Sequence, residues 1–209
     1  FINPRSFIKN NISGFFNVLN LSLEFKVKKF FYASSSSVYG EAKKFPLKEN
    51  CILKPKNIYG LSKKMNEQII DVSLHKKNTQ CIGLRFFTVY GPWGRPDMAM
   101  FIFADKISSG KSIEVFNHGN MKRDFTYIDD IISGTRSAME NNYLCEVFNL
   151  GNHKSENLMD MIGIIENNLG TKAKIDFQPM QPGDLPESFA DIKKSIEMLS
   201  YRPTTDINE

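Results

Sequence analysis

Two apolar, strand-like segments enclose a helix-like segment in the first half of the chain, and this order constrains the fold more than any other feature. Residues 28–35 form an apolar run that ends in serines, residues 57–75 carry apolar side chains at helical spacing, and residues 80–86 form a second apolar run. A strand, a helix and a strand in this order predict parallel strands joined by a right-handed crossover. A further helix is predicted over residues 3–23, with Pro4 in its first turn. We therefore expect an α/β fold.

After Gly91 the predicted elements become shorter and alternate in type. Helices are predicted over residues 98–109, from Asp129 or Asp130 to 140, over 155–168 and over 191–199; extended segments are predicted over 113–116, 124–128, 146–150 and 173–178. Asp129 or Asp130, Ser155 and Asp191 are the predicted N-caps, and Gly170 is the predicted end of its helix.

The composition favours a globular protein that binds neither membranes, nucleic acids nor metals. The 209 residues include 27 Lys and Arg against 23 Asp and Glu, a formal charge of +4, and the lysines are spread along the chain as on a solvated surface. No apolar run approaches the ~20 residues of a membrane span, and no signal-peptide pattern is visible. The cysteines and histidines show no metal-ligand spacing: Cys51, Cys81, Cys145, His75, His118 and His153. Reduced thiols and a cytoplasmic location are the expectation.

Tyr59 and Lys63 form a Tyr-x-x-x-Lys pair in the segment predicted as a helix. This spacing places the two side chains on one helix face, about one turn apart. A lysine charge within ~4–6 Å of a tyrosine favours its phenolate form. With a serine hydroxyl from residues 34–37, the pair can take a proton from a substrate alcohol while a hydride leaves the same carbon, as nicotinamide-dependent oxidation requires. The spacing alone is common by chance, and most instances are ordinary helix residues.

Several longer motifs surround this pair in a consistent order. They read ASSSSVYG at residues 33–40, YGLSKK at 59–64, LRFFTVYGP at 84–92, GPWGRPDMA at 91–99, NHG at 117–119 and MKRDFTYIDD at 121–130. Over nearly its whole length the chain resembles the extended short-chain dehydrogenase/reductase family, specifically its nucleotide-sugar epimerases and dehydratases. Within that family it resembles the UDP-glucuronate 4-epimerases most closely.

The resemblance implies part of a Rossmann-type, doubly wound parallel sheet with a smaller, interleaved C-terminal substrate domain. Residues 1–97 would belong to the NAD-binding domain, and residues 98–209 mainly to the nucleotide-sugar domain, with 124–151 returning to the sheet. The family opens with a glycine-rich turn that receives the dinucleotide pyrophosphate, and no such turn precedes the serine-ending strand here. The expectation is an N-terminally truncated fragment, inactive and poorly stable alone. A homodimer of the full-length parent would form through the helices at 3–23 and 57–75.

The resemblance also implies a role for individual residues. The catalytic group would be Ser35, Tyr59 and Lys63, with Ser36 as the alternative to Ser35. NAD would be bound by Asn11, Ala33, Ser34, Tyr59, Lys63, Phe86 and Val89. The UDP-sugar would be bound by Ser35, Ser36, Ser37, Thr88, Arg95, Asn117, Arg123 and Asp184. Arg123 carries the planar guanidinium that suits a phosphate, whereas Gln181 stands where many relatives have a second arginine, which puts that second diphosphate contact in doubt.

The implied reaction is oxidation at C4 of a UDP-hexuronic acid by NAD, rotation of the 4-keto sugar, and return of the hydride to the other face. A dehydratase would ordinarily carry Asp-Glu where Ser36 and Ser37 stand, so loss of water is disfavoured. Decarboxylation of UDP-glucuronate starts from the same keto sugar and stays open. A catalytically silent fragment is the alternative from another class.

Overall fold

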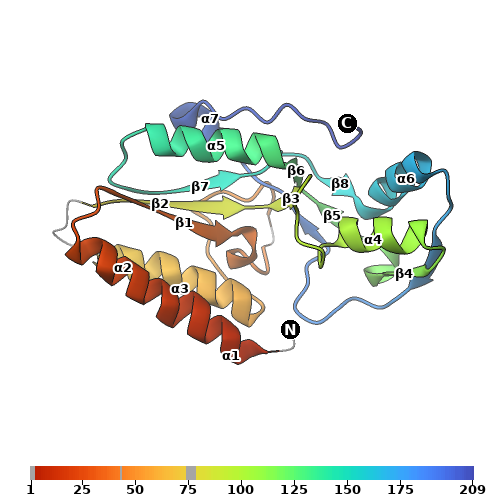
Figure 1. Ribbon diagram of the computed structural model, residues 1–209, viewed down its shortest axis with the longest axis horizontal. Helices are drawn as coiled ribbons and strands as arrows, with labels where there is room; N and C mark the ends of the chain where they lie inside the picture. The colour runs from red at the N-terminus through yellow and green to blue at the C-terminus, as the bar shows by residue number, and fades with distance from the viewer. Residues whose placement is uncertain (1–2, 43, 74–78) are drawn as a thin grey trace.

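A three-stranded parallel sheet forms the centre of the protein in the computed structural model, which describes residues 3–42, 44–73 and 79–209 (Figure 1). Its order is β1 (Lys29–Ser35), β2 (Gln80–Phe86) and β7 (Cys145–Leu150). Helix α3 (Ile58–Ser73) connects the first two strands, which pair in parallel. The predicted strand–helix–strand unit is therefore confirmed, although the end of the predicted helix at 74–75 lies outside the described residues.

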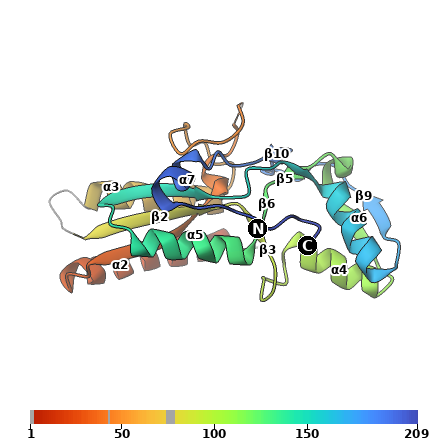
Figure 2. The ribbon, with the colours of Figure 1, turned by 90° about the horizontal axis from the view of Figure 1, so that it is seen from above.

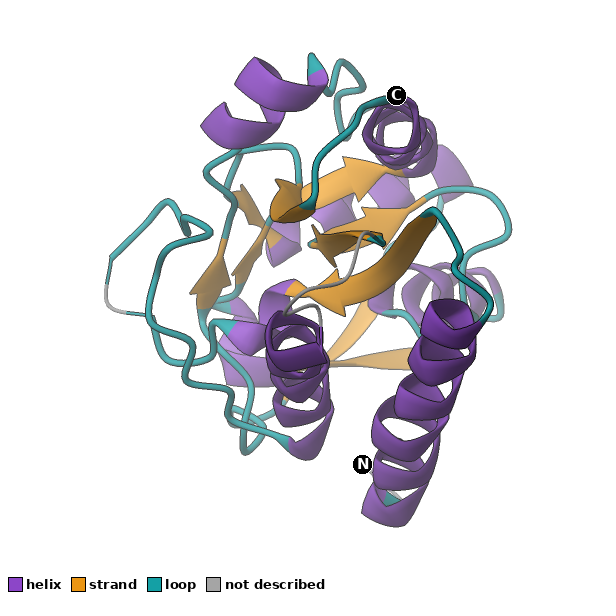
Figure 3. Ribbon diagram, turned by 90° about the vertical axis from the view of Figure 1, so that its left-hand side faces the viewer, coloured by secondary structure: helices purple, strands orange, loops and turns teal. Residues whose placement is uncertain are grey.

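Helices cover both faces of this sheet (Figures 1 and 3). On one face lie α3 and a long N-terminal helix made of α1 (Pro4–Phe7), a π-helical segment (Ile8–Gly14) and α2 (Phe15–Glu24). On the other face lie α5 (Ile128–Glu140) and α7 (Lys193–Leu199). This doubly wound arrangement places helices over both sides of the sheet, which explains the apolar runs in β1 and β2.

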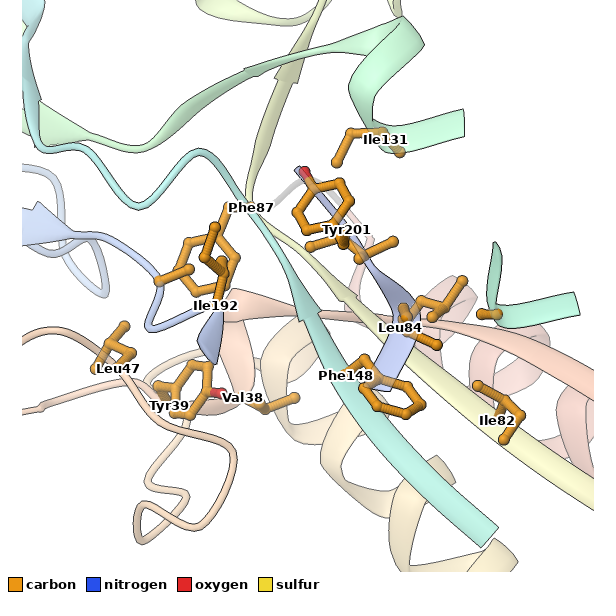
Figure 4. Packing of buried hydrophobic residues seen from close by; sticks show 14 residues of the cluster. Val38, Tyr39, Leu47, Ile82, Leu84, Phe87, Ile131, Phe148, Ile192 and Tyr201 are labelled. Carbon is orange, nitrogen blue, oxygen red and sulfur yellow. The ribbon is translucent and has the colours of Figure 1, made fainter. Parts of the chain in front are cut away.

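The core on the α5 side is built from side chains of the sheet and of the segments folded over it (Figure 4). Leu84, Phe148 and Tyr201 are each at most 2% exposed within this cluster. A second cluster around Leu19, Tyr32 and Ile70 packs the sheet against α2 and α3. Arg85, 4% exposed, is the exception in a strand whose other buried residues are apolar or glycine.

A smaller region lies beyond the carboxyl ends of the strands, at the right of Figures 1 and 2. It holds α4 (Ala99–Ser108), α6 (Leu158–Leu169) and the parallel pair β4 (Ser112–Val115) and β9 (Lys174–Phe177). Their core includes Phe103, Ile113, Val115, Phe125, Met161 and Ile162. Short strands join the two regions: β3 (Thr88–Tyr90) with β6 (Phe125–Tyr127), and β5 (Lys122–Arg123) between β8 (Glu156–Asn157) and β10 (Glu187–Ser188).

Two predicted N-caps are wrong. Helix α5 begins at Ile128, so Asp130 lies in its first turn and accepts hydrogen bonds from the backbone N–H groups of Thr204 and Thr205. Helix α6 begins at Leu158, and the Ser155 hydroxyl donates to Glu187 instead. In both cases a more distant polar group takes the side chain that would otherwise satisfy the helix end.

The predicted end of α6 holds: Gly170 ends this helix with φ 63°, a left-handed conformation that costs glycine little. The N-cap of α7 is Ile192, one residue after the predicted Asp191, although the Asp191 carboxylate accepts from the backbone N–H of Lys193, the first residue of that helix. None of the described helices is long and apolar enough to cross a membrane.

Candidate active site

The carboxyl ends of β1 and β2 meet at one edge of the sheet. Ser35 and Phe86, the last residues of the two strands, are register partners. The residues that follow them therefore come together, as expected at the carboxyl edge of a parallel sheet. They line a cavity of about 630 Å³ that includes residues 33–37, Tyr59 and residues 86–95.

Tyr59 reaches this cavity from the first turn of α3. One turn further on, Lys63 places its Nζ 5.9 Å from the centre of the Tyr59 ring. The same Nζ donates a 2.8 Å hydrogen bond to the carbonyl oxygen of Ala33. Burial lowers the pKa of the Lys63 ammonium. A half-buried cation is thus held between the phenol ring and the strand end.

The four serines differ in what their hydroxyls do. The Ser34 hydroxyl donates to the Glu67 carboxylate at 2.6 Å, so it is already engaged. The Ser35 hydroxyl, 8% exposed as a residue, accepts from the backbone N–H of Ser37 at 3.2 Å. Ser36 and Ser37 begin a short 3-10 helix and line the cavity. Ser35, Ser36 and Ser37 therefore line the cavity beside Tyr59, and Ser35 is the last residue of the strand.

Of the predicted cofactor contacts, Ala33, Phe86 and Val89 line the same cavity. Asn11 does not line it; its side-chain amide donates to the Ser62 hydroxyl on α3 at 3.1 Å. Asn11 therefore ties the π-helical segment to the helix that carries Tyr59.

Two further hollows continue from Thr88 towards the smaller region. One, of about 150 Å³, shares Ser36, Ser37 and Thr88 with the first cavity. The other, of about 410 Å³, shares Thr88, Arg123 and Asp184 with the small one. The three form adjoining spaces from the sheet edge to the smaller region.

Arg123 lies at this second end, with 17% of its side chain exposed. Its Nη2 donates to the Asp184 carboxylate at 2.8 Å, and its Nη1 to the carbonyl oxygen of Lys122. Burial lowers the pKa of the guanidinium, and the charge of Asp184 acts in the opposite sense. Because arginine stays protonated in proteins, a partly desolvated cation faces these hollows.

The neighbouring Asp124 is fully buried and accepts four hydrogen bonds. Its donors are the Thr126 hydroxyl and the backbone N–H groups of Asn152, His153 and Ala190. Burial raises the pKa of this carboxyl, although the hydrogen bonds oppose the shift. Asp124 therefore binds three segments behind Arg123, at residues 126, 152–153 and 190.

Arg95 and Asn117 lie less favourably for ligand contact. Arg95 lines the first cavity, but its guanidinium forms two hydrogen bonds to Asp97, at 2.9 and 2.7 Å, with 70% of its side chain exposed. Asn117 has φ 51°, and its amide donates to the carbonyl oxygen of Asn120 at 2.7 Å. Asn117 lines none of the three hollows described above.

Sequence reasoning missed some lining residues and a buried ion pair. Met98, Phe116 and Leu158 line the hollows, but apolar residues in amphipathic segments give no signal that separates them from core. Glu67 and Arg85, which pair beneath the serines, do give a signal: each is charged within an apolar pattern. Within the described ranges, no three His, Cys, Asp or Glu side chains gather as metal ligands.

The arrangement can perform acid–base chemistry at one end and hold an anion at the other. A phenol, an ammonium and serine hydroxyls meet at the sheet edge, and a half-buried guanidinium lies at the far end of the adjoining hollows. Such a site fits a substrate that carries an alcohol at one end and a phosphate at the other.

Comparison with known proteins agrees with such a site. The model of the NAD dependent epimerase/dehydratase family matches residues 1–151. An uncharacterized protein of Methanocaldococcus jannaschii is 47% identical over 208 residues, which is 99% of this chain and 64% of that protein. UDP-glucuronate 4-epimerase 4 of Arabidopsis thaliana is 41% identical over 98% of this chain and 51% of its own length.

A solved structure of UDP-glucuronic acid 4-epimerase from Bacillus cereus, in complex with UDP-glucuronic acid and NAD, superposes with a TM-score of 0.91 at 35% identity. The match covers 96% of this chain and 64% of that one. The chain thus spans about two thirds or less of these relatives. From the family model and the relatives together, the chain belongs to the NAD-dependent epimerase/dehydratase family.

Proposed function

We propose that this chain provides the catalytic and nucleotide-sugar-binding residues of an NAD-dependent UDP-sugar 4-epimerase that interconverts UDP-glucuronate and UDP-galacturonate. The observation that carries the proposal is the Tyr59–Lys63 pair beside the serines at the sheet edge, with adjoining hollows that lead from there to Arg123. The similarity to epimerases whose structures contain UDP-glucuronic acid and NAD supports it.

In this proposal Ser35, Tyr59 and Lys63 are the catalytic group. Tyr59 takes the proton of the C4 hydroxyl, Ser35 shares it, and Lys63 holds its charge beside the phenol. After the 4-keto sugar has turned over, Tyr59 returns the proton to the carbonyl oxygen. Ser36 remains the alternative to Ser35, because both line the cavity.

The residues at the sheet edge fit the nicotinamide end of NAD. Ala33, Ser34, Phe86 and Val89 form a wall of the cavity that holds Tyr59, and the Lys63 ammonium lies at its border. When bound, NAD would supply the acceptor and donor of the hydride. Asn11 would act from the first helix, through Ser62. No glycine-rich turn precedes β1 in this chain, so we propose that NAD binding needs a segment that supplies one.

For the substrate, we assign Arg123 to the diphosphate and Asp184 to the ribose of uridine. Their mutual hydrogen bond would then reorganise when UDP binds. Ser36, Ser37 and Thr88 would donate to the sugar carboxylate, and Arg95 would join them by leaving Asp97. Asn117 is the least supported assignment, because its amide is already used locally.

Residues 1–97 and most of 124–151 are assigned to the NAD-binding domain, and the rest of 98–209 to the sugar-nucleotide domain. A homodimer through the first helix and α3 is part of the proposal. Val18, Leu21, Leu61 and Val72, on α2 and α3, are each at least 42% exposed, which supports an apolar contact there.

Other UDP-sugars are the competing substrates. Solved structures of a UDP-glucose 4-epimerase from Thermotoga maritima and of a UDP-N-acetylglucosamine 4-epimerase from Methanobrevibacter ruminantium superpose with TM-scores of 0.92 and 0.90, each at 27% identity. Decarboxylation to UDP-xylose is opposed by hydroxyl donors that would retain the carboxylate.

The deciding experiment follows the products of UDP-glucuronic acid with NAD by NMR. It is run on the chain alone, which we expect to be inactive, and on a polypeptide that carries a glycine-rich segment before it. UDP-galacturonic acid that disappears in Tyr59→Phe supports the proposal. UDP-xylose would move the protein to the decarboxylases, and turnover restricted to neutral UDP-sugars would overturn the choice of glucuronate.

A further inference from the structure

A buried ion pair connects α3 to β2 directly beneath the proposed active site. Arg85 donates to the Glu67 carboxylate through Nε at 2.9 Å and Nη2 at 2.7 Å. The two side chains are 4% and 8% exposed. Arg85 Nη1 also donates to the Tyr39 hydroxyl at 2.9 Å and to the carbonyl oxygen of Glu49. This pair is therefore largely buried, and its polar atoms have hydrogen-bond partners.

The pair belongs to a polar row that crosses the sheet one residue before the strands end. Ser34, Arg85 and Asn149 are register partners on β1, β2 and β7. Ser34 donates to Glu67, and the Tyr39 hydroxyl links Arg85 to Asn149, to which it donates at 2.6 Å. The next residue of β1 after this row is Ser35. A single peptide unit therefore separates this row from Ser35.

On the helix side, Tyr59, Lys63 and Glu67 follow one another at four-residue intervals on one face of α3. Lys63 holds the carbonyl oxygen of Ala33 at 2.8 Å, and Glu67 holds the hydroxyl of Ser34 at 2.6 Å. Two successive turns of the helix are therefore fastened to the two strand residues that precede Ser35.

Stability alone does not explain such a pair. Well-packed apolar residues of similar volume are often as stable as a buried ion pair, or more so, because both charges lose their hydration. Burial would lower the pKa of Arg85, but Glu67 and Tyr39 raise it further than burial lowers it, so the guanidinium keeps its charge. The pair does supply a defined geometry, since a bidentate contact fixes both the distance and the angle between the two side chains.

We propose that Glu67 and Arg85 are positioning residues of the epimerase reaction, which set α3 against β1 and thereby hold the Tyr59 phenol in register with the Ser35 hydroxyl. The inference rests on the proposed function. Neither residue lines the cavity that contains Tyr59, so both act through Ser34 and the helix. They border a separate hollow of about 640 Å³ that contains none of the proposed catalytic residues.

Three variants test the proposal in the complete, NAD-supplied enzyme, with kcat expressed per UDP-binding site so that unfolded protein is not counted. Glu67→Gln weakens the pair, and we expect kcat to fall about a hundredfold, as for a misplacement of about 1 Å, with KM for the UDP-sugar within about twofold. Ser34→Ala leaves the pair intact but cuts its link to the strand, and we expect a roughly tenfold fall. The double variant Glu67→Leu, Arg85→Met is expected to recover the melting temperature without recovering kcat.

Glu146→Gln is the matched control, because Glu146 lies on β7, away from the serines, and forms an ion pair with Lys194 of α7. Its kcat should stay within about twofold of the unsubstituted enzyme. Unchanged kcat in Ser34→Ala and Glu67→Gln, or recovery of kcat along with melting temperature in the double variant, would overturn the inference and leave the proposed function standing. Absence of turnover by the unsubstituted enzyme with every UDP-sugar would overturn both.

Discussion

The two ends of the site are built in different ways. At the sheet edge, Tyr59, Lys63 and Ser35 stand on elements that are 16 and 7 residues long. Two hydrogen bonds join these elements, from Lys63 to Ala33 and from Ser34 to Glu67, and the second is buried. At the far end, Arg123 stands on a two-residue strand between two other two-residue strands, behind which lies one buried carboxylate, Asp124. The end proposed for bond-making is therefore held by long regular elements. The end proposed for binding is held mainly by the hydrogen bonds of one buried carboxylate.

This contrast predicts that substitutions at the two ends have separable effects. The sheet edge should control turnover, and the far end should control affinity and local stability.

Tyr59→Phe tests whether turnover can be lost without loss of binding. Removal of the phenolic hydroxyl removes the proposed acid–base, which is expected to lower kcat by about 10²–10⁴-fold. The affinity for UDP, measured by calorimetry, should stay within about twofold, because Arg123 and Asp184 are untouched. A parallel loss of UDP affinity would show that the ends are not independent.

Asp124→Asn tests how far this buried carboxylate stabilises the far end of the site. The amide cannot accept all four hydrogen bonds that the carboxylate accepts, and an unpaired buried donor costs about 1–3 kcal/mol. We expect the free energy of unfolding to fall by about 2–3 kcal/mol in urea titrations at neutral pH. A change below about 0.5 kcal/mol would mean that the surrounding strands hold this region without it.

The same variant should change the pH dependence of stability. Because burial raises the pKa of Asp124 above 3.8 in the folded state, its protonated form is favoured there. The resulting stabilisation is complete below 3.8 and is lost as the pH rises through the raised pKa. Asp124→Asn cannot titrate, so the difference in unfolding free energy between the two proteins should change across this window and stay constant above it.

Arg123→Met tests the binding end directly. Hydrogen bonds to charged groups are worth about 1.5–3 kcal/mol, so UDP affinity should fall by about 10- to 100-fold by calorimetry. The kcat at saturating substrate should fall much less. Arg123→Lys is the matched control, since it keeps the charge but loses the planar fork, and we expect it to recover only part of the affinity.

Lys63→Met should give the smallest change, which is a change in how stability depends on pH. The folded-state pKa of Lys63 is lowered by burial, so the folded protein gives up this proton more readily than the unfolded chain. The stability of the unsubstituted protein therefore gains a contribution as the pH rises from that lowered value towards 10.5. Lys63→Met should lack this gain in urea titrations at pH 8 to 10, while Lys64→Met should keep it.

The sequence predicts the long elements well because their apolar periodicity is strong. The strands around β1 and β2 and the helix α3 follow from repeats of buried side chains, and Gly170 follows from its backbone freedom. The positions of Tyr59, Lys63 and the serines follow from the same order of elements. These features depend on neighbours that are close along the chain.

The remainder depends on partners that are far apart in sequence. Asp130 and Ser155 have the residue types of helix caps, yet they bond to Thr204, Thr205 and Glu187 because tertiary contacts outcompete the helix ends. Arg85 in an apolar strand does signal a buried partner, but nothing in the sequence selects Glu67 over other acids. Nor does the sequence predict the local hydrogen bond from the Asn117 amide to the carbonyl oxygen of Asn120.

If Arg95 binds the sugar carboxylate as proposed, its exposed ion pair with Asp97 would make substrate choice an exchange of partners. An acidic sugar would replace one carboxylate partner of Arg95 by another, so the number of ion pairs is unchanged on binding. A neutral sugar would leave Arg95 with Asp97. Selection for charge at this rim would then arise from the small difference between two similar contacts, and rising ionic strength would weaken both. Discrimination among sugars would therefore depend on the hydroxyl donors of the cavity. Their geometry does not change with ionic strength.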